Sequence, residues 1–171
     1  MQEYDYSIVI GRFSPIHMSH VKMLNFALSK SKKLIIFIGS STSFRTDKNP
    51  WLANERIEMI RSCFSKEENE NIILIPIKDY SNDNDWKKEI YNNLPQNNTK
   101  ILIGCNKDSS SYYLNLFDDI SFNHFDLVGN INATDIREKF FINESGWEIN
   151  LHPYVTKFLI NWKNKYSGDI I

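Results

Sequence analysis

Short runs of apolar, β-favouring residues alternate along the chain with segments in which apolar residues recur at helical spacing. Strands that alternate with helices are typical of βαβ units, which form a parallel sheet. The run at 34–38, Leu-Ile-Ile-Phe-Ile, is apolar throughout, as expected for a strand covered on both faces. The pattern therefore predicts an α/β fold with a doubly wound, parallel, five-stranded sheet. The predicted strands are Tyr6–Ile10, Leu34–Ile38, Ile72–Ile77, Lys100–Ile103 and Phe125–Val128.

The helical pattern is clearest in four segments, two between strands and two after the last strand. Asn132 or Thr134 is expected to cap the third of these helices, and Pro153 suits the first turn of the fourth. The polar stretches 66–71 and 92–99 are interpreted as surface loops. The predicted helices are Met18–Ser29, Ala53–Phe64, Thr134–Phe141 and Pro153–Tyr166.

The composition is that of an ordinary globular domain. Its 20 basic and 21 acidic residues give a net charge of -1, which argues against a general affinity for nucleic acid. No apolar run approaches the roughly 18–20 residues of a membrane span, and the acidic start lacks the pattern of a secretory signal. The two cysteines, Cys63 and Cys105, make neither a disulfide framework nor a zinc site. We therefore expect one cytoplasmic domain over residues 1–171, with no nucleic-acid or membrane partner.

The first predicted strand runs directly into residues that suit a phosphate site. Ligands of open parallel sheets bind beyond the carboxyl ends of the strands, and Gly11 permits close backbone approach there. If a helix begins near Ile16–Met18, His17 and His20 lie on one face of its first turn, beside free backbone N–H groups. Two imidazoles, Arg12 and a helix N-terminus together predict a phosphate site.

A metal half-site is the alternative reading of the histidine pair. A zinc-binding helical pair is spaced i, i+4 with an intervening glutamate, whereas His17 and His20 are three apart and no third ligand is evident. No protein ligands for a metal are therefore predicted. Isolated histidines such as His124 and His152 are interpreted as surface or core residues.

The string from Gly11 to His20 resembles the HxGH signature of the nucleotidyltransferase superfamily, in its GRFxPxHxGH form. Ser19 stands where the superfamily has glycine, and Ser14 where many relatives carry glutamine. The resemblance implies a Rossmann-like nucleotidyltransferase fold with catalytic His17 and His20. It also implies that these histidines bind ATP together with Gly11, Arg12 and Phe13.

The segment after the second strand narrows the resemblance to one branch. Gly39-Ser40, Lys48-Asn49-Pro50-Trp51 and Glu55-Arg56-Ile57-Glu58-Met59-Ile60 are similar to the GS…KNPF/W…ERxEMI block of archaeal-type nicotinamide mononucleotide adenylyltransferases. That type also forms the N-terminal half of bacterial enzymes fused to a Nudix hydrolase. The resemblance implies that Ser40, Arg45 and Lys48 bind the mononucleotide, the two cations being suited to a second phosphate. A solvated basic loop is the alternative for either cation alone.

The segment Asp79–Trp86, after the third strand, is where this branch places an Asp, an Asn and a Trp around the nicotinamide ring. The resemblance implies these roles for Asp79 and Trp86, with Asn82 and Asn84 both candidates for the asparagine. Stacking of an indole on a cationic pyridinium contributes roughly 0.5–2 kcal/mol. The alternative is that Trp86 packs on the core at the start of a helix.

Two later segments complete the resemblance. The run from Gly104 to Phe117 is similar to the GxxKDxSSYYLxLF run of the fused bacterial enzymes, which implies that Gly104 and Lys107 bind ATP. Thr134-Asp135-Ile136-Arg137 resembles the second superfamily signature, (I/L)SxTxxR, which implies that Thr134 binds phosphate and that Arg137 binds ATP and takes part in catalysis. Cys105 stands where relatives often have histidine and is assigned no reactive role.

The resemblance implies transfer of the adenylyl group of ATP to nicotinamide mononucleotide, giving NAD and pyrophosphate. The attacking phosphate is already an anion, so catalysis should consist of positioning and charge neutralisation. We expect Mg²⁺ to be bound through the ATP phosphates. The alternatives are adenylyl or cytidylyl transfer to another phosphorylated acceptor, and a non-catalytic domain that senses NAD or ATP.

The last residues of the sequence do not show whether this domain stands alone or is part of a longer enzyme. The helix Pro153–Tyr166 matches the close of the catalytic domain, and Ser167–Ile171 is predicted as a short tail. No Nudix box follows it, and the sequence does not decide between a stand-alone enzyme and the N-terminal half of a fused one. It also leaves open homo-oligomer formation and the preference for the amidated or deamidated mononucleotide.

Overall fold

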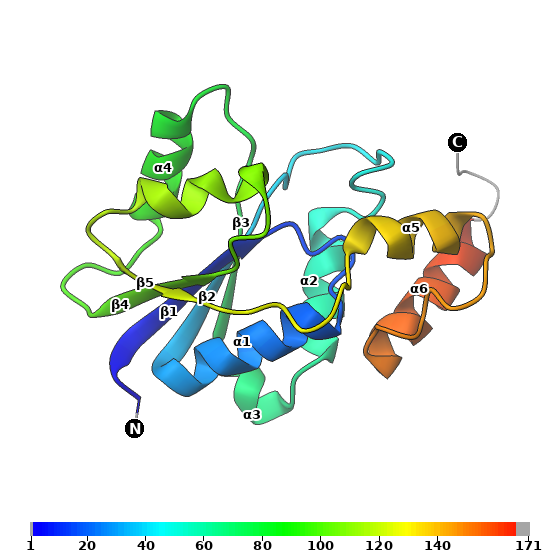
Figure 1. The fold of residues 1–171 in the computed structure, drawn as a ribbon, viewed down its shortest axis with the longest axis horizontal. Coiled ribbons are helices and arrows are strands. Elements are labelled where there is room, and N and C mark those ends of the chain that lie inside the picture. The colour runs from blue at the N-terminus through cyan, green and yellow to red at the C-terminus, as the bar shows by residue number, and fades with distance from the viewer. Residues whose placement is uncertain (1, 167–171) are drawn as a thin grey trace.

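Five parallel strands form one sheet in the order β3-β2-β1-β4-β5 (Figure 1). The computed structural model describes residues 2–166, and the predicted tail Ser167–Ile171 lies outside the described residues. The parallel α/β sheet predicted from the sequence is confirmed. The strands are β1 (Tyr4–Gly11), β2 (Ser31–Ile38), β3 (Ile72–Pro76), β4 (Lys100–Gly104) and β5 (Ser121–His124).

Helices cover both faces of the sheet. Alternate side chains of a strand point to opposite faces, so Val9 and Ile36 join a core cluster with α1 and α2, whereas Ile8 and Ile35 join a cluster with α4 and η1. The sheet is therefore buried on both sides, which explains its nearly continuous apolar strands. The helices are α1 (Met18–Lys30), α2 (Ala53–Ser62), α3 (Lys66–Asn69), α4 (Asp83–Asn92), the 3-10 helix η1 (Ser109–Leu116), α5 (Ala133–Phe141) and α6 (Pro153–Tyr166).

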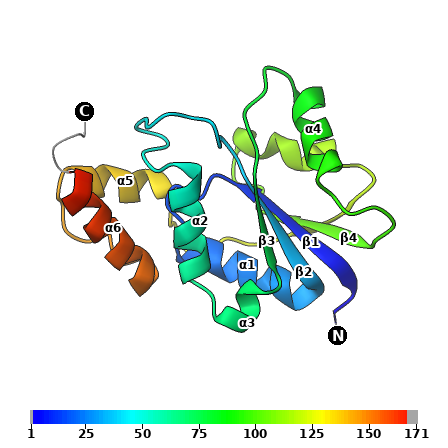
Figure 2. The same ribbon diagram turned by 180° about the vertical axis from the view of Figure 1, so that it is seen from behind.

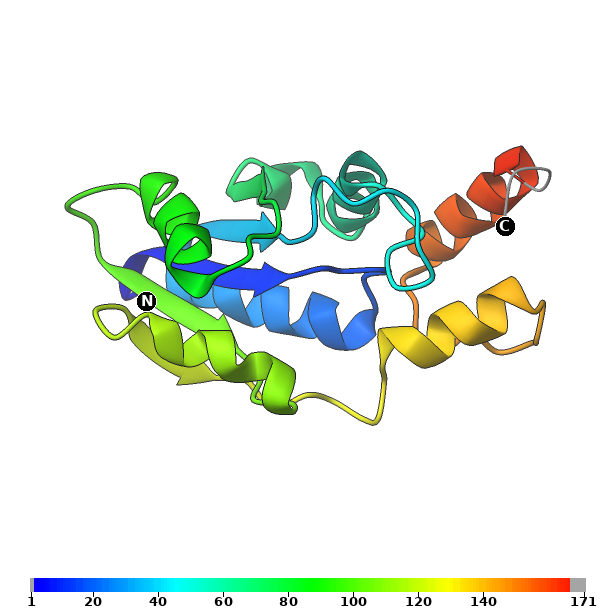
Figure 3. The same ribbon diagram turned by 90° about the horizontal axis from the view of Figure 1, so that it is seen from above.

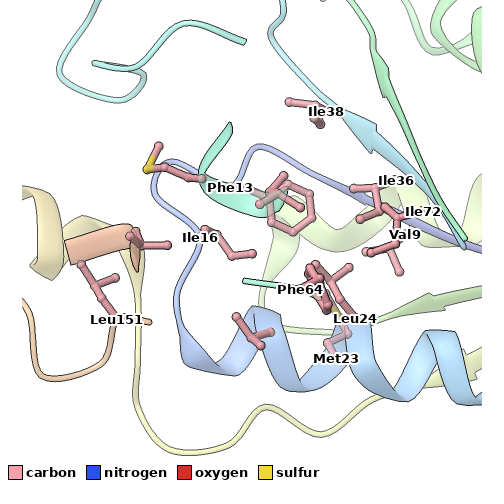
Figure 4. Close-up of a cluster of buried hydrophobic side chains, with 14 of the residues drawn as sticks. Val9, Phe13, Ile16, Met23, Leu24, Ile36, Ile38, Phe64, Ile72 and Leu151 are labelled. Carbon is pink, nitrogen blue, oxygen red and sulfur yellow. The ribbon is translucent and has the colours of Figure 1, made fainter. Parts of the chain in front are cut away.

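The first core cluster extends to the turn between β1 and α1. Phe13 and Ile16 on this turn are buried and face the side chains of the sheet and of α1 (Figure 4). From the other direction, Leu151 packs into the same cluster, and the Met18 N–H donates to the carbonyl oxygen of Asn150 at 2.9 Å. The turn that carries both histidines is thus anchored on a packed core.

Helices α5 and α6 lie beyond the carboxyl ends of the strands, as the front, back and top views all show (Figures 1, 2 and 3). Helix α6 contacts α2, and the buried indole N–H of Trp162 donates to Glu55 at 2.9 Å. The two helices therefore flank the end of the sheet where ligands of parallel sheets bind. Within residues 2–166, no helix combines the length and the apolar character needed to cross a bilayer.

The fifth strand differs from the prediction: it is Ser121–His124, and the predicted span Phe125–Val128 is wrong. The strand is a polar edge strand, paired only with β4 among the described residues. Phe125, directly after it, packs on α1 instead, with its ring centroid 5.5 Å from that of Phe26. The apolar character of Phe125 therefore reflects contact with a helix, and it misled the strand assignment.

A second difference concerns the stretch predicted as a loop at 66–71. Residues Lys66–Asn69 form the short helix α3, and Ser65 and Glu68 cap it reciprocally. The Ser65 hydroxyl accepts the Glu68 N–H at 3.2 Å, and the Glu68 carboxylate accepts the Ser65 N–H at 2.7 Å. This Ser-x-x-Glu pattern is a known helix start. The predicted second helix also ends earlier, at Ser62.

Candidate active site

The two histidines lie at the N-terminus of α1, directly beyond the carboxyl end of β1. His17 occupies the cap position and His20 the first turn. Their rings stack with centroids 3.7 Å apart and 18° between the planes. The His17 backbone N–H donates to Nδ1 of His20 at 3.4 Å, which fixes the orientation of that ring. The predicted pairing on one helix face is therefore present.

Both imidazoles are neutral at neutral pH. Burial, with a contribution from the charge of Lys107, lowers the pKa of His17 to about 4. Burial also holds the pKa of His20 well below its ordinary value, and proximity to His17 and to the charge of Lys107 lowers it further. Nδ1 of His17 is buried and has no hydrogen-bond partner within residues 2–166. A buried polar atom without a hydrogen-bond partner is a natural contact for a ligand.

The turn before the histidines is fixed by close packing. A Cβ at Gly11 would lie 3.0 Å from the ring of Phe13, so this position needs a glycine unless the ring shifts. The Phe13 ring is buried and meets the His20 ring edge-on, with centroids 5.0 Å apart. Ser19, the departure from the HxGH signature, is fully buried, and its hydroxyl accepts the Val128 N–H at 3.3 Å. The added hydroxyl is thereby engaged with the segment that follows β5.

Arg137 approaches the same turn from α5. Asn132 caps this helix by accepting the Asp135 N–H at 2.8 Å, which confirms one of the two predicted caps. Arg137 donates to the carbonyl oxygens of Ser14 and Asp47 at 2.7 and 3.1 Å, and to the Thr134 hydroxyl at 3.2 Å. These bonds use three of the five N–H donors of a guanidinium group. Burial and the neighbouring charge of Arg12 lower the pKa of Arg137.

A cleft of about 1160 Å³ lies between the loop 45–50, α5 and α6. Arg12, Lys48 and Arg137 contribute positive charge to its wall, and Thr134 contributes a hydroxyl. Segments that are far apart in the sequence thus bring phosphate-binding groups to one opening. Of the residues predicted to bind ATP, Arg12, Thr134 and Arg137 line this cleft, together with Lys48, which was predicted to bind the mononucleotide.

Gly104 and Lys107 lie beyond the carboxyl end of β4. A Cβ at Gly104 would come within 2.5 Å of the Leu114 side chain, so the glycine allows η1 to pack on β4. Lys107 is exposed, and its backbone N–H donates to the Ser111 hydroxyl at 3.1 Å. Burial is the main cause of the lowered pKa values of both histidines, and the charge of Lys107 adds to it.

The residues predicted to bind the mononucleotide lie beyond β2 and β3. Ser40 has a left-handed backbone, with φ of 52°, and its hydroxyl donates to Asp79 at 3.0 Å. Asn82 caps α4: its side-chain oxygen accepts the Asp85 N–H at 2.9 Å and its amide donates to the Asp85 carboxylate at 2.8 Å. Asn84 is exposed in the first turn of α4. Of the two candidate asparagines, Asn84 therefore has the less constrained side chain.

Trp86 is partly buried and packs on aromatic side chains of the second core cluster. Its ring lies edge-on to that of Tyr113 and tilted to that of Phe117, with centroids 5.9 Å away in both cases. These contacts agree with the alternative prediction, that Trp86 packs on the core at the start of a helix. Stacking on a nicotinamide ring stays a prediction.

Arg45 and Lys48, predicted together at a phosphate, differ in their contacts. Arg45 forms a bidentate ion pair with Glu55, at 2.6 and 2.8 Å, and also donates to the carbonyl oxygen of Pro50. Its guanidinium lies over the rings of Trp162 and Tyr166. Lys48 is exposed in the cleft. The structure therefore gives Arg45 a structural role and presents Lys48 to ligands.

Glu55 and Arg56 are the two residues near the site whose contacts the sequence did not suggest. Both lie in the ER dipeptide at the start of α2, and both are buried although charged. The resemblance to the ERxEMI block marked the two residues but not their contacts, because their partners are remote side chains and backbone carbonyls.

The side chains of the cleft suit phosphate groups better than a resident metal ion. Within residues 2–166, no group of three or more His, Cys, Asp or Glu side chains could hold a metal. Cationic side chains outnumber carboxylates in the cleft lining, where Asp47 and Glu138 are the two acidic residues. A histidine pair after the first strand and a Thr-x-x-Arg turn after the fifth define a nucleotidyltransferase site.

The chain belongs to the cytidylyltransferase-like family, which residues 8–139 match. It is 38% identical over 146 residues to a nicotinamide/nicotinic acid mononucleotide adenylyltransferase from Acinetobacter baylyi, covering 82% of this chain and 78% of that protein. It is 26% identical over 158 residues to a nicotinamide-nucleotide adenylyltransferase from Aeropyrum pernix, covering 89% of this chain and 88% of the relative. The narrower branch indicated by the sequence is thereby confirmed.

The fold is also that of a solved structure from Francisella tularensis, a bifunctional NMN adenylyltransferase/ADP ribose pyrophosphatase complexed with AMP and a manganese ion. The TM-score is 0.82 at 31% sequence identity, and the match covers 94% of this chain. The chain spans about half of that protein, 49% of its length. The Rossmann-like nucleotidyltransferase fold is therefore confirmed.

Proposed function

We propose that this chain transfers the adenylyl group of ATP to nicotinamide mononucleotide, giving NAD and pyrophosphate. One observation carries the proposal: the stacked pair His17–His20 lies at the helix N-terminus beyond β1, and Arg137 is bonded to the same turn. The relatives from Acinetobacter baylyi and Aeropyrum pernix, both adenylyltransferases of this kind, support the same acceptor.

The chain's contribution to the reaction is positioning and charge neutralisation. A phosphate monoester is already anionic at neutral pH, so its oxygen needs no general base to attack the α-phosphorus of ATP. The neutral imidazoles of His17 and His20 can donate hydrogen bonds to phosphate oxygens as negative charge builds in the transition state. The bond to pyrophosphate breaks as the new phosphoanhydride bond forms.

Three cations are proposed to hold the triphosphate. Arg12 and Arg137 line the cleft, and the charge of Lys107 contributes to the lowered pKa of His17. Thr134, in the first turn of α5, can add its hydroxyl and the backbone N–H groups of the helix N-terminus. We propose that Mg²⁺ enters as part of the ATP substrate. The relative from Francisella tularensis has a manganese ion with AMP.

The mononucleotide is proposed to bind on the β2 and β3 side of the site. Lys48 would contact its phosphate, while Asp79 and Asn84 could pair with the carboxamide of the nicotinamide ring. Trp86 would then offer its ring edge or face from α4. The ends of the neighbouring strands β1 and β2 lie side by side, because the Gly39 N–H donates to the Gly11 carbonyl oxygen at 3.0 Å. Substrates bound at these two strand ends would therefore meet near Arg12 and Ser40.

A substrate panel tests the proposal. Purified protein is supplied with ATP or CTP and with nicotinamide mononucleotide, its deamidated form or pantetheine phosphate, and released pyrophosphate is measured. We expect pyrophosphate release only when ATP is combined with one of the two pyridine mononucleotides. Release with CTP or with pantetheine phosphate would favour another transferase of the superfamily, and no release with any pair would favour a sensing domain.

A further inference from the structure

Arg56 is the most deeply buried charged residue near the site. Its side chain belongs to α2 and is 1% exposed. No carboxylate within residues 2–166 lies at salt-bridge distance from it. Four backbone carbonyl oxygens accept its hydrogen bonds instead. Burial lowers its pKa only to about 10, so the group is charged at neutral pH.

The carbonyl partners of Arg56 belong to both substrate sides. Nη1 donates to the Arg12 oxygen at 2.7 Å and to the Gly39 oxygen at 2.8 Å. Nη2 donates to the Ser40 oxygen at 3.1 Å, and Nε to the Trp51 oxygen at 3.1 Å. One planar guanidinium thus joins the turn after β1 to the turn after β2. A fixed fork of donors sets the spacing and orientation of these turns.

Both turns need such support because each contains a non-glycine residue whose backbone is in the left-handed region. Phe13, which follows Arg12, has φ of 52°, and Ser40 has φ of 52°. Such backbone persists only where the surrounding structure determines it. Phe13 in turn packs on His20, and the Ser40 hydroxyl donates to Asp79. A shift of either carbonyl would therefore move groups of the triphosphate side or of the mononucleotide side.

We infer that Arg56 is a positioning residue for the transfer reaction, which holds the two substrate-binding turns at the distance that in-line attack requires. The inference rests on the proposed function. Loss of Arg56 should therefore impair the use of both substrates, whereas loss of a residue that belongs to one turn should impair the use of one. The largest effect should be on kcat, because misplacement of reacting groups by about 1 Å can cost about 10²-fold in rate.

Arg56→Lys is the test variant, since it keeps the charge and loses the planar fork. Arg61→Lys, an exposed position on the same helix, is the matched control. Steady-state rates are measured for both substrates well below the melting temperature of each protein, with folding checked by circular dichroism. Arg56→Gln is measured in parallel, in case the lysine variant does not fold.

We expect folded Arg56→Lys to lose about 10–100-fold in kcat, with KM raised for ATP and for the mononucleotide, and Arg61→Lys to match the wild type. Wild-type kinetics in a folded Arg56 variant would overturn the inference, because a purely structural arginine affects melting and not turnover. A change confined to one KM, or failure of both Arg56 variants to fold, would also overturn it. Inactivity of the wild-type protein would instead refute the proposed function.

Discussion

Arg137 donates a hydrogen bond to the carbonyl oxygen of Ser14, which lies 123 residues earlier in the chain, at 2.7 Å. This bond ties α5 to the turn that carries the histidine pair. The same guanidinium also bonds the loop 45–50 through Asp47. Arg137 therefore occupies the point where the three walls of the proposed triphosphate site meet.

Replacement of Arg137 by lysine should weaken the use of ATP selectively. A lysine ammonium is a point charge and cannot reproduce the planar, bidentate contact of a guanidinium with phosphate. We predict that Arg137→Lys raises KM for ATP distinctly more than KM for the mononucleotide, as initial-rate kinetics with each substrate varied in turn will show. Equal effects on both, or none, would make Arg137 a structural link only.

Replacement of His20 by alanine should act on the transition state. Charge grows on the α-phosphoryl group and on the leaving pyrophosphate, and the neutral imidazole is placed to stabilise it. We predict that kcat falls by roughly 10²–10³, the effect of losing one preorganised donor, with smaller changes in KM. His152→Ala, on the segment before α6, is the control. Near-wild-type turnover in folded His20→Ala would remove this residue from the mechanism.

The lowered pKa of His17 makes stability depend on pH. An unfolded histidine titrates near 6.5, whereas folded His17 titrates at about 4, so between these values the unfolded state binds more protons. The free energy of unfolding should therefore fall as the pH drops from 6.5 to 4, by up to about 3 kcal/mol from this group. Urea unfolding of the wild type and of His17→Gln at several pH values measures the difference. Parallel curves for the two proteins would contradict the assigned shift.

Trp86→Ala and Trp86→Phe distinguish ring stacking from core packing. If the indole stacks on nicotinamide, the alanine variant should lose roughly 5–150-fold in mononucleotide affinity, with ATP affinity almost unchanged, and phenylalanine should restore much of it. Calorimetric titration with each ligand, beside melting curves, provides the comparison. If Trp86 only packs against Tyr113 and Phe117, the alanine variant should have a lower melting temperature, and its affinities for ATP and for the mononucleotide should fall alike.

The loop 45–50 offers a pair of substitutions with opposite expectations. Arg45→Ala breaks the bidentate pair with Glu55 and should lower the free energy of unfolding by about 2–3 kcal/mol. Lys48→Ala should leave stability unchanged and raise KM for the mononucleotide. Urea unfolding and initial rates on both variants decide the matter. A stable Arg45→Ala protein with a selectively raised mononucleotide KM would return Arg45 to the phosphate site.

The parts of the site that the sequence predicts are those set by local structure. His17 and His20 face together because residues three apart share one face of a helical turn, and Asn132 caps α5 through its own neighbouring N–H groups. The parallel sheet follows from apolar strands between helical segments. These features depend on residues near each other in the chain, so the pattern contains them.

The remaining parts depend on long-range contacts. The bonds of Arg56 to carbonyls of Arg12 and Gly39 cross from α2 to two strand ends, and no spacing in the sequence indicates them. The pairing of Arg45 with Glu55 likewise follows from the path of the loop. The displaced fifth strand has the same origin, because the apolar Phe125 is explained by its contact with Phe26 of α1.

Formation of NAD from ATP and nicotinamide mononucleotide by the purified chain is the decisive measurement. NAD is followed as NADH after coupling to alcohol dehydrogenase, and pyrophosphate is measured in the same samples. We predict equal amounts of the two products, dependence on both substrates, and a rate lowered roughly 10²–10³-fold in His20→Ala. Absence of NAD in the presence of both substrates and Mg²⁺, or pyrophosphate released without NAD, would contradict the proposed activity.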